Sequence, residues 1–411
     1  MRKILALLLS TALAAMLAFP AAADEVDEKG RVVTEYFSSD MLEDTFGEAV
    51  AAAVSLSDLS ALKAKAAILV DRKSGSVLFE SNADEQLSPA SITKVMSLLL
   101  ITEAIADGRL TLETKVTCSE HASSMGGSQI WFEVGETMTV DELLKAVAVG
   151  SANDATVALA EAVAGSEEAF VDMMNARAKE LGMTNTCFKN CSGLDADGHL
   201  TTARDIAIMS CELMKHSLIK KYTTIWIDSL RSGATQLVNT NKLIRFYPGA
   251  TGLKTGTTDK AGCCLSASAE RDGLSLVAVV LGSPTSNDRF ASAKALLNYG
   301  FSNYCEASVP ISLGKQSIVP VNHGTQMSVK LKVKDKLALL TEKVNKDGFS
   351  VQLELPDEVD APVKKGEVIG RAVVYLNAAR VGEAEITAAE KVDKMDMPHA
   401  LQRMLSGLLT N

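Results

Sequence analysis

The chain has 411 residues, of which 47% are hydrophobic, 22% charged and 5% aromatic. This length and composition indicate a globular protein of two or three domains. The formal net charge of −10 argues against nucleic acid as a partner, because phosphate backbones need a basic protein face. An anionic small substrate remains possible, since a few local lysine and arginine side chains are enough to hold one.

The N-terminus has the pattern of an export signal. The basic pair Arg2-Lys3 precedes an apolar run from Ile4 to Phe19, and the small residues Ala21-Ala22-Ala23 follow. The apolar run is short for a membrane span. We therefore predict a signal peptide over residues 1–23 and a mature protein that works outside the cytoplasm.

Residues 24–60 are expected to be a lead-in segment without assignable structure. A β-hairpin is predicted next, with strands over 66–71 and 76–80. The following segment, 89–106, is apolar on nearly all sides, which is typical of a buried central helix. Ser88 suits the N-cap of this helix, and a proline at position 89 costs nothing at the first helical position.

The middle of the chain, 138–225, has mostly helical periodicity, and strands return after it. Residues 262–270 and 274–281 read as two strands joined by Asp272-Gly273, a strong hairpin signal. A helix over 288–299 closes this part. Strands at both ends with helices between them predict an α+β domain in which a sheet is flanked by a helical region.

Short β-like segments separated by Gly, Pro, Asn and Asp follow Cys305, which predicts a small all-β domain. We expect its strands over 317–321, 327–333, 349–355, 367–376 and 380–386. The last residues, 391–411, have leucines at helical spacing and basic residues nearby. Two interpretations stay open for this amphipathic segment, namely contact with an anionic membrane surface and packing as a terminal helix.

Seven cysteines are present: Cys118, Cys187, Cys191, Cys211, Cys263, Cys264 and Cys305. An odd number in so long an exported chain predicts mostly reduced, buried thiols instead of a disulfide framework. Cys263 and Cys264 are adjacent on a predicted strand and should point to opposite faces of its sheet.

The first motif with chemical meaning is Ser91-Ile92-Thr93-Lys94, at the start of the buried helix. Residues three apart share a helix face, so Lys94 can reach the Ser91 hydroxyl. A serine becomes a strong nucleophile when a base takes its proton, and lysine is such a base only when neutral. Burial and a second nearby cation both favour neutral lysine. The tetrad alone is weak, because such sequences are common on helix surfaces.

The second motif is Ser151-Ala152-Asn153, in a turn between two helical stretches. A hydroxyl and an amide on one loop can relay a proton and hold a substrate amide. Taken alone, helix capping explains these residues equally well.

The third motif is Lys254-Thr255-Gly256, followed by Thr257. On a strand, Lys254 can supply the cation that lowers the pKa of Lys94. Gly256 in a strand interior indicates close approach of another backbone, for which the substrate is one candidate.

The three motifs together, in this order and these settings, match the set found in serine β-lactamases and penicillin-binding proteins. The chain resembles the D-alanyl-D-alanine carboxypeptidases, the low-molecular-mass penicillin-binding proteins of the type 5 group, over nearly all its mature length. Gly127-Ser128, Gly135-Glu136 and the stretch 190–205 support the resemblance.

The resemblance implies an α+β fold with a β-lactamase/transpeptidase-like catalytic domain over 61–304. A small β-rich domain over 305–390 and the C-terminal amphipathic helix would follow. The implied activity is removal of the terminal D-alanine from peptidoglycan stem peptides, with penicillins and other β-lactam antibiotics as further acylating partners. No metal or organic cofactor is implied, and the implied location is the outer face of the cytoplasmic membrane or the cell-wall space.

The resemblance also implies roles for the catalytic residues. Ser91 would be acylated by the penultimate D-alanine carbonyl, Lys94 would be the general base, and Ser151 would pass the proton to the departing D-alanine. The backbone N–H groups of Ser91 and Thr257 would form the oxyanion hole.

The implied substrate-binding residues lie on other segments. Asn153 would hold the stem-peptide amide, and Lys254 and Thr255 would face the terminal carboxylate beside Gly256. Arg289 would help them, although its match rests on position alone and a solvated surface arginine is the more ordinary alternative.

Three rival functions use the same site. A class A β-lactamase needs a glutamate to activate the deacylating water, and the corresponding segment here, 184–188, has none. Transpeptidation uses an amine in place of water and remains possible. A non-catalytic wall-binding protein would keep the fold without acylation of Ser91.

Other catalytic classes lack their sequence signals. The five histidines show no metal-binding spacing, and no Gly-x-Ser-x-Gly elbow supports a Ser-His-Asp hydrolase. We interpret His199 as part of a structured loop.

Overall fold

The computed structural model describes residues 23–26, 32–35 and 55–400. The signal-peptide prediction lies almost entirely outside these residues. The chain divides into two compact units, the first made of residues 1–271 and 275–302 and the second of 272–274 and 303–411.

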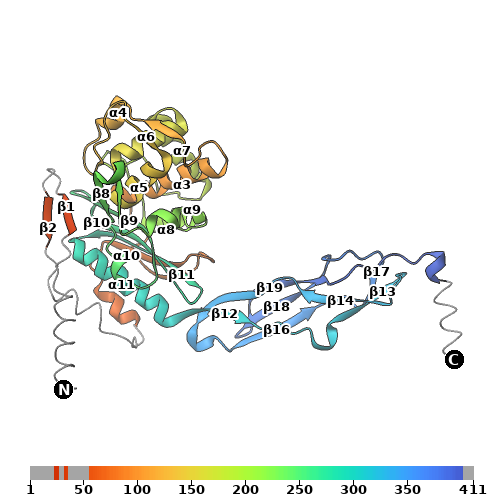
Figure 1. Cartoon of the computed structure of the whole chain (residues 1–411). Coiled ribbons are helices and arrows are strands. Elements are labelled where there is room, and N and C mark those ends of the chain that lie inside the picture. Colours follow the sequence, from red (N-terminus) through yellow and green to blue (C-terminus); the bar gives the residue numbers. More distant parts are fainter. Residues whose placement is uncertain (1–22, 27–31, 36–54, 401–411) are drawn as a thin grey trace, which may run out of the picture. The chain divides into compact units, whose positions relative to one another are not determined.

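The first unit is built on a five-stranded sheet with the order β4-β3-β11-β10-β9 (Figure 1). Its strands are β3 (Ala66–Asp71), β4 (Val77–Ser81), β9 (Ala250–Thr258), β10 (Gly262–Arg271) and β11 (Leu274–Ser283). The two predicted hairpins are therefore confirmed, and strands from both ends of the unit meet where β11 pairs with β3. Strand β9 forms an edge of the sheet, so one side of its backbone is available to other groups.

Helices cover both faces of this sheet (Figure 1). On one face, α11 (Ser286–Asn303) approaches so closely that a Cβ on Gly300 would lie 2.4 Å from a side-chain carbon of Leu276. On the other face lies α8 (Ala203–Leu213), where the hydroxyls of Ser210 and Ser266 hydrogen-bond at 2.8 Å.

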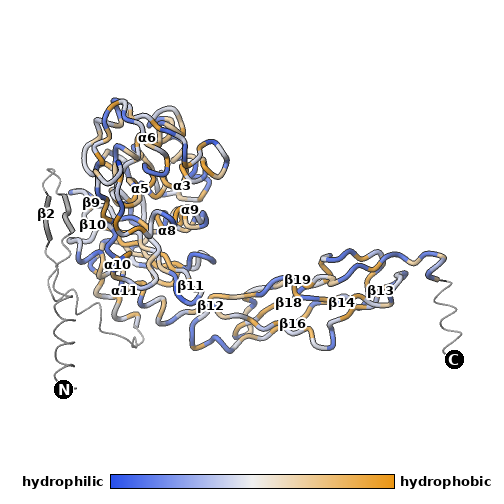
Figure 2. The backbone as a smooth tube through the Cα atoms, viewed as in Figure 1, coloured by the Kyte–Doolittle hydropathy of each residue, from blue (hydrophilic) through white to orange (hydrophobic). Residues whose placement is uncertain are grey.

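The helical region surrounds α3 (Lys94–Ala106), which is buried along nearly its whole length. Figure 2 shows hydrophobic residues concentrated along α3 and the central strands. The prediction of a buried central helix is confirmed, because an element with no polar face must be enclosed on all sides. Its neighbours are α8 and the helices α5 (Val140–Gly150), α6 (Asn153–Ala164), α7 (Glu167–Glu180) and α9 (Ser217–Thr223), and α4 (Glu120–Ser123) packs on α6.

The start of the central helix differs from the prediction. The α-helix begins at Lys94 instead of Pro89, and a separate 3₁₀ turn, η2 (Ala90–Thr93), precedes it. Ala90 has φ +49°, a conformation outside the helical region. The carbonyl of Ala90 is also approached closely by Gly193, where a Cβ would lie 2.0 Å from that oxygen. A contact from a distant segment therefore sets this turn, and local propensity does not reveal it.

The second unit is all-β, as predicted. Its six-stranded sheet has the order β16-β18-β19-β14-β13-β17, with β12 (Tyr304–Val309) and β15 (Leu337–Glu342) paired separately. The predicted strands correspond to β13 (Ile318–Asn322), β14 (Ser328–Val333), β16 (Phe349–Glu354), β18 (Val368–Leu376) and β19 (Ala379–Ala388). Both strands of the β12–β15 pair were absent from the prediction, as was the short β17 (Val359–Asp360).

The C-terminal helix predicted over 391–411 lies partly outside the described residues. Val392 and Lys394 form β-bridges with Val363 and Gly324, so the chain still belongs to the β unit at these positions. Within the part of the chain that the structure describes, no helix combines the length and apolarity needed to span a membrane.

All seven cysteines are free thiols, as predicted. The prediction that they are mostly buried is wrong, because only Cys118, Cys191 and Cys264 are buried and the others are partly exposed. Cys263 and Cys264 differ in exposure, as side chains on opposite faces of β10 should.

Candidate active site

The side chains of Ser91 and Lys94 meet where the 3₁₀ turn passes into α3. The Lys94 amine lies 3.0 Å from Ser91 Oγ, as the spacing of the first motif predicts. The same amine donates to Asn153 Oδ1 at 2.5 Å and to the carbonyl oxygen of Ser192 at 2.6 Å. Lys94 is completely buried, whereas Ser91 remains partly exposed. Ser91 is therefore accessible to solvent, while the Lys94 amine is shielded from water.

Burial lowers the pKa of Lys94 to about 7, against the opposing influence of Cys191 and Asp154. A large share of Lys94 is then a free amine at neutral pH, which allows it to act as a base. We predicted that burial and a nearby cation, Lys254, would both lower this pKa, and burial of Lys94 is the main cause.

The second motif lies at the junction of α5 and α6, as predicted. Ser151 ends α5 with φ +61°, and Asn153 is the first residue of α6. The Asn153 side chain accepts from Lys94 and donates through Nδ2 to the carbonyl of Gly126 at 2.7 Å. The backbone N–H of Asn153 also donates to Ser128 at 2.7 Å. Asn153 thus links Lys94 to the loop that precedes α5.

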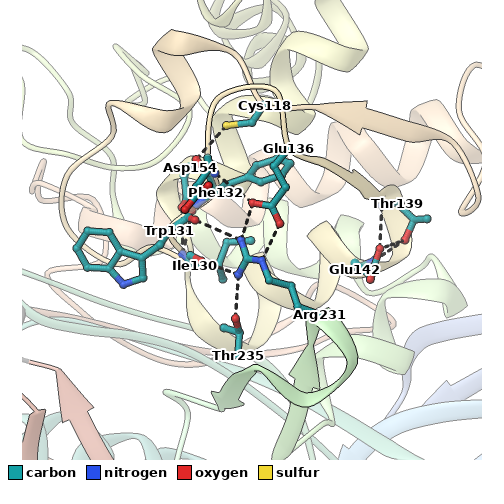
Figure 3. A network of polar contacts seen from close by, with 11 residues as sticks. Cys118, Ile130, Trp131, Phe132, Glu136, Thr139, Glu142, Asp154, Arg231 and Thr235 are labelled. Carbon is teal, nitrogen blue, oxygen red and sulfur yellow. Dashed lines mark hydrogen bonds and ion pairs between the residues drawn. The ribbon is translucent and has the colours of Figure 1, made fainter.

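That loop is fixed by two charged residues (Figure 3). The buried Asp154 carboxylate accepts from the N–H groups of Ile130 and Phe132, each at 3.0 Å. Arg231 donates to the Ile130 carbonyl at 2.9 Å and pairs with Glu136 at 2.7 Å. Because the loop is held on both sides, its contacts with Asn153 are also held in place.

Arg231 belongs to a hairpin that the sequence did not predict, formed by β7 (Ile227–Leu230) and β8 (Thr235–Val238). Its turn uses positive φ at Arg231 and Ser232, residue types that rarely adopt this conformation. The turn also contains Gly233, so the Ser232-Gly233 dipeptide was a turn signal that the sequence analysis did not use.

The third motif lies on the edge strand β9. Lys254 is 1% exposed and Thr255 is 5% exposed, and Thr255 donates to the hydroxyl of Thr240 at 2.7 Å. A Cβ on Gly256 would lie 3.0 Å from the Pro89 carbonyl and from the Ser91 nitrogen. Within the chain, the backbone that approaches Gly256 most closely is therefore the turn that carries Ser91.

Arg289 lies in α11 and reaches across to β9. It is 4% exposed, so the alternative of a solvated surface arginine is wrong. Its guanidinium donates to the Gly256 carbonyl at 3.2 Å and to Thr257 Oγ1 at 2.9 Å. Burial, with the charges of Lys94 and Arg289, holds the pKa of Lys254 well below its usual range. Lys254 thus lies close enough to Lys94 and Arg289 for their positive charges to oppose its own, and an anionic ligand placed here would relieve that repulsion.

Sequence reasoning missed a turn that holds the catalytic pair. Ser192 supplies a backbone carbonyl to Lys94, and Gly193 packs on Ala90 next to Ser91. The Ser192 contact comes from a backbone carbonyl, which carries no residue-type signal, and the need for glycine at 193 becomes clear only from its contact with Ala90. The only hint was that these residues fall within the stretch 190–205 that supports the family resemblance.

His199 hydrogen-bonds to Thr93, within the first motif. Its Nδ1 accepts the Lys189 N–H at 3.1 Å, so the proton of the neutral ring lies on Nε2 and is donated to Thr93 Oγ1 at 2.9 Å. Burial lowers the pKa of His199 to about 4. The interpretation of His199 as part of a structured loop therefore extends to the first motif itself.

This histidine should make the protein sensitive to acid. The unfolded chain binds a proton at His199 below about pH 6.5 while the native state does not, so stability falls as the pH drops from about 6.5 to about 4. Between pH 7.5 and 5 the expected loss is about 2 kcal/mol of unfolding free energy. His199→Gln should show a loss smaller by that amount in urea unfolding, whereas equal losses would contradict this account.

A serine hydroxyl bonded to a buried lysine, beside an Asn side chain and a cationic strand, is the arrangement of a serine acyl-transferring enzyme. Within the described residues no cluster of three or more His, Cys, Asp or Glu side chains could hold a metal ion. Residues 51–285 match the family model for D-alanyl-D-alanine carboxypeptidase, and residues 310–394 match the C-terminal domain of penicillin-binding protein 5. The chain therefore belongs to the D-alanyl-D-alanine carboxypeptidase family and is a serine peptidase.

Known proteins agree with this assignment over most of the chain. D-alanyl-D-alanine carboxypeptidase DacF of Bacillus subtilis (strain 168) is 42% identical over 349 residues, which cover 84% of this chain and 89% of the relative. Penicillin-binding protein 5 from Haemophilus influenzae has a TM-score of 0.66 and 30% identity, covering 81% of this chain and 98% of that one. Penicillin-binding protein D2 from Listeria monocytogenes, in its ampicillin-bound form, has a TM-score of 0.54 and 33% identity, covering 59% and 98%.

Proposed function

We propose that Ser91 of this D-Ala-D-Ala carboxypeptidase attacks the penultimate D-alanine carbonyl of a peptidoglycan stem peptide. The observation that carries the proposal is the 3.0 Å hydrogen bond between Ser91 Oγ and the buried Lys94 amine. Lys94 takes the hydroxyl proton as the Oγ–C bond forms. The carbonyl oxygen becomes an oxyanion, which the backbone N–H groups of Ser91 and Thr257 bind.

Collapse of the tetrahedral intermediate breaks the peptide bond. The proton held by Lys94 passes through the Ser151 hydroxyl to the departing D-alanine amine, and the acyl group stays on Ser91. Water then attacks this ester, and Lys94 receives its proton and returns it to Ser91 Oγ. The products are D-alanine and a stem peptide shortened by one residue.

The terminal carboxylate of the substrate is recognised by the cationic side of the site. Lys254 and Thr255 lie on β9 and Arg289 on α11, and the electrostatic coupling of Lys254 with Arg289 supports this role. The substrate chain extends along β9 past Gly256, and Asn153 holds its amide from the opposite side. An edge strand can pair with an extended peptide in this way.

The same attack opens a β-lactam ring and leaves a penicilloyl ester on Ser91. Two measurements test the assignment together. We expect release of D-alanine from a peptide that ends in D-Ala-D-Ala, and we expect a penicillin adduct on the proteolytic fragment containing Ser91. An adduct that turns over rapidly without D-alanine release would favour a β-lactamase, and the absence of both signals would favour a non-catalytic wall-binding protein.

We further propose that the catalytic domain spans 61–304, the β-rich domain 305–390, and that the enzyme works at the outer face of the cytoplasmic membrane. The segment 391–411 would touch that surface, with leucines on one side and Lys391, Lys394 and Arg403 near anionic headgroups. Full-length mature protein should then cosediment with vesicles containing anionic lipid, and truncation at Met395 should abolish this. Equal cosedimentation of the two proteins would count against membrane contact.

A further inference from the structure

A buried carboxylate lies behind the catalytic pair and belongs to none of the three motifs. Glu167, the first residue of α7, is 9% exposed. Its Oε1 accepts the N–H of Cys191 at 3.0 Å, and its Oε2 lies 2.7 Å from Nε2 of the half-exposed His121. An acidic residue in a first helical turn is ordinarily explained by the helix dipole. Here Ser166 already caps α7, and the Glu167 carboxylate points to another segment.

The segment that Glu167 holds is the turn 190–194, buried at residues 191–193, which we name the lysine turn. It meets the catalytic pair at two points, since the Ser192 carbonyl accepts from the Lys94 amine at 2.6 Å and Gly193 packs on Ala90 next to Ser91. The turn is closed internally by Asn190, whose Oδ1 accepts the Gly193 N–H at 2.7 Å. A shift of this turn would therefore move the base and the nucleophile together.

Besides the bond from Lys94 to Ser192, two hydrogen bonds tie the lysine turn to the helices around it, and both involve the backbone of Cys191. Glu167 accepts its N–H, and the Ser97 hydroxyl donates to its carbonyl at 2.6 Å. Ser97 lies on α3, the same helix that begins with Lys94, so its bond fixes the turn only relative to that helix. Glu167 supplies the anchor to α7. Cys191 and Ser192 are adjacent, so the anchor lies one residue from the carbonyl that holds Lys94.

We propose that Glu167 is a positioning residue for catalysis, which anchors the lysine turn so that the Ser192 carbonyl holds the Lys94 amine against Ser91. This inference rests on the proposed role of Lys94 as the base. The groups that face Glu167 are His121 and the Cys191 thiol, whose pKa is raised by burial and by Glu167, so the thiol stays neutral. The titratable groups that act on Lys94, or on which it acts, are Cys191, Asp154 and Lys254.

The test compares Glu167→Ala, which removes the acceptor, with Glu167→Gln, which keeps an oxygen for the Cys191 N–H. The second-order rate constant for Ser91 acylation by a penicillin is measured from pH 5.5 to 9, with thermal unfolding in parallel. Misplacement of catalytic groups by an ångström can cost about 10²-fold. We expect Glu167→Ala to be slower by roughly 30- to 100-fold and Glu167→Gln to stay within about fivefold of the wild type.

The pH profile separates positioning from general destabilisation. Without the Ser192 carbonyl the ammonium form of Lys94 loses an acceptor, so the acid limb of acylation should move to lower pH in Glu167→Ala. Loss of folded protein alone would lower the rate without moving that limb. Glu168→Gln is the matched control, because the neighbouring carboxylate is exposed and should leave both rate and limb unchanged.

Several outcomes would overturn the proposal. Folded Glu167→Ala with wild-type rate and profile would do so, and so would Glu167→Gln as slow as the alanine variant. If Glu167→Ala does not fold, Glu167→Asp retracts the acceptor by one methylene and should be roughly tenfold slower. An unchanged aspartate variant would also reject the anchor. Failure of the wild type to be acylated at Ser91 would instead reject the proposed function.

Discussion

Ser91→Ala is expected to lower D-alanine release by about 10⁵-fold or more, and to abolish the penicillin adduct. Removing the nucleophile of a serine hydrolase costs on the order of 10⁶ in turnover, because the remaining groups act only with it. Lys94 and Asn153 keep their mutual hydrogen bond in the variant, so the site should stay assembled. D-alanine release and intact-protein mass after penicillin treatment measure the two effects.

The matched control for this variant is Ser88→Ala, a buried serine in the same segment whose hydroxyl is not among the Lys94 contacts. It should keep wild-type release and full adduct formation. A Ser91→Ala protein that still forms a stoichiometric adduct would place the nucleophile elsewhere. Adduct formation on the wild type without D-alanine release would leave Ser91 as nucleophile but remove the carboxypeptidase assignment.

The residues that meet in the site could be predicted from sequence because their side chains carry the chemistry. Lys94 hydrogen-bonds to both Ser91 and Asn153, and Arg289 contacts β9, as the motifs and the family resemblance implied. The two sheet hairpins were also predictable, since Asp272-Gly273 and the turn before β4 use ordinary turn residues.

The details that tune the site depend on contacts between distant segments, and these were not predictable. The 3₁₀ turn at Ala90 forms where Gly193 packs against it. The Ser192 carbonyl is a backbone group, and Glu167 resembles any acidic residue at a helix start. Burial and the charge of Lys254 were both expected to lower the pKa of Lys94, but the extent of the burial that dominates is a property of the packed structure.

Replacing Lys94 is expected to have the second large effect on acylation, because its amine is hydrogen-bonded to Ser91. Lys94→Met removes the amine while keeping an unbranched side chain of similar length, and should slow Ser91 acylation by about 10³- to 10⁴-fold, the usual contribution of a general base. Wild-type acylation should fall roughly thirtyfold between pH 8 and 5.5, because only neutral Lys94 accepts a proton and burial sets its pKa at about 7. The residual rate of Lys94→Met should lack this acid limb.

Lys179→Met, on the exposed side of α7, is the control for losing a lysine. A Lys94→Met enzyme that keeps the wild-type limb would show that another group titrates, and the base would then have to be sought among the other residues that contact Ser91.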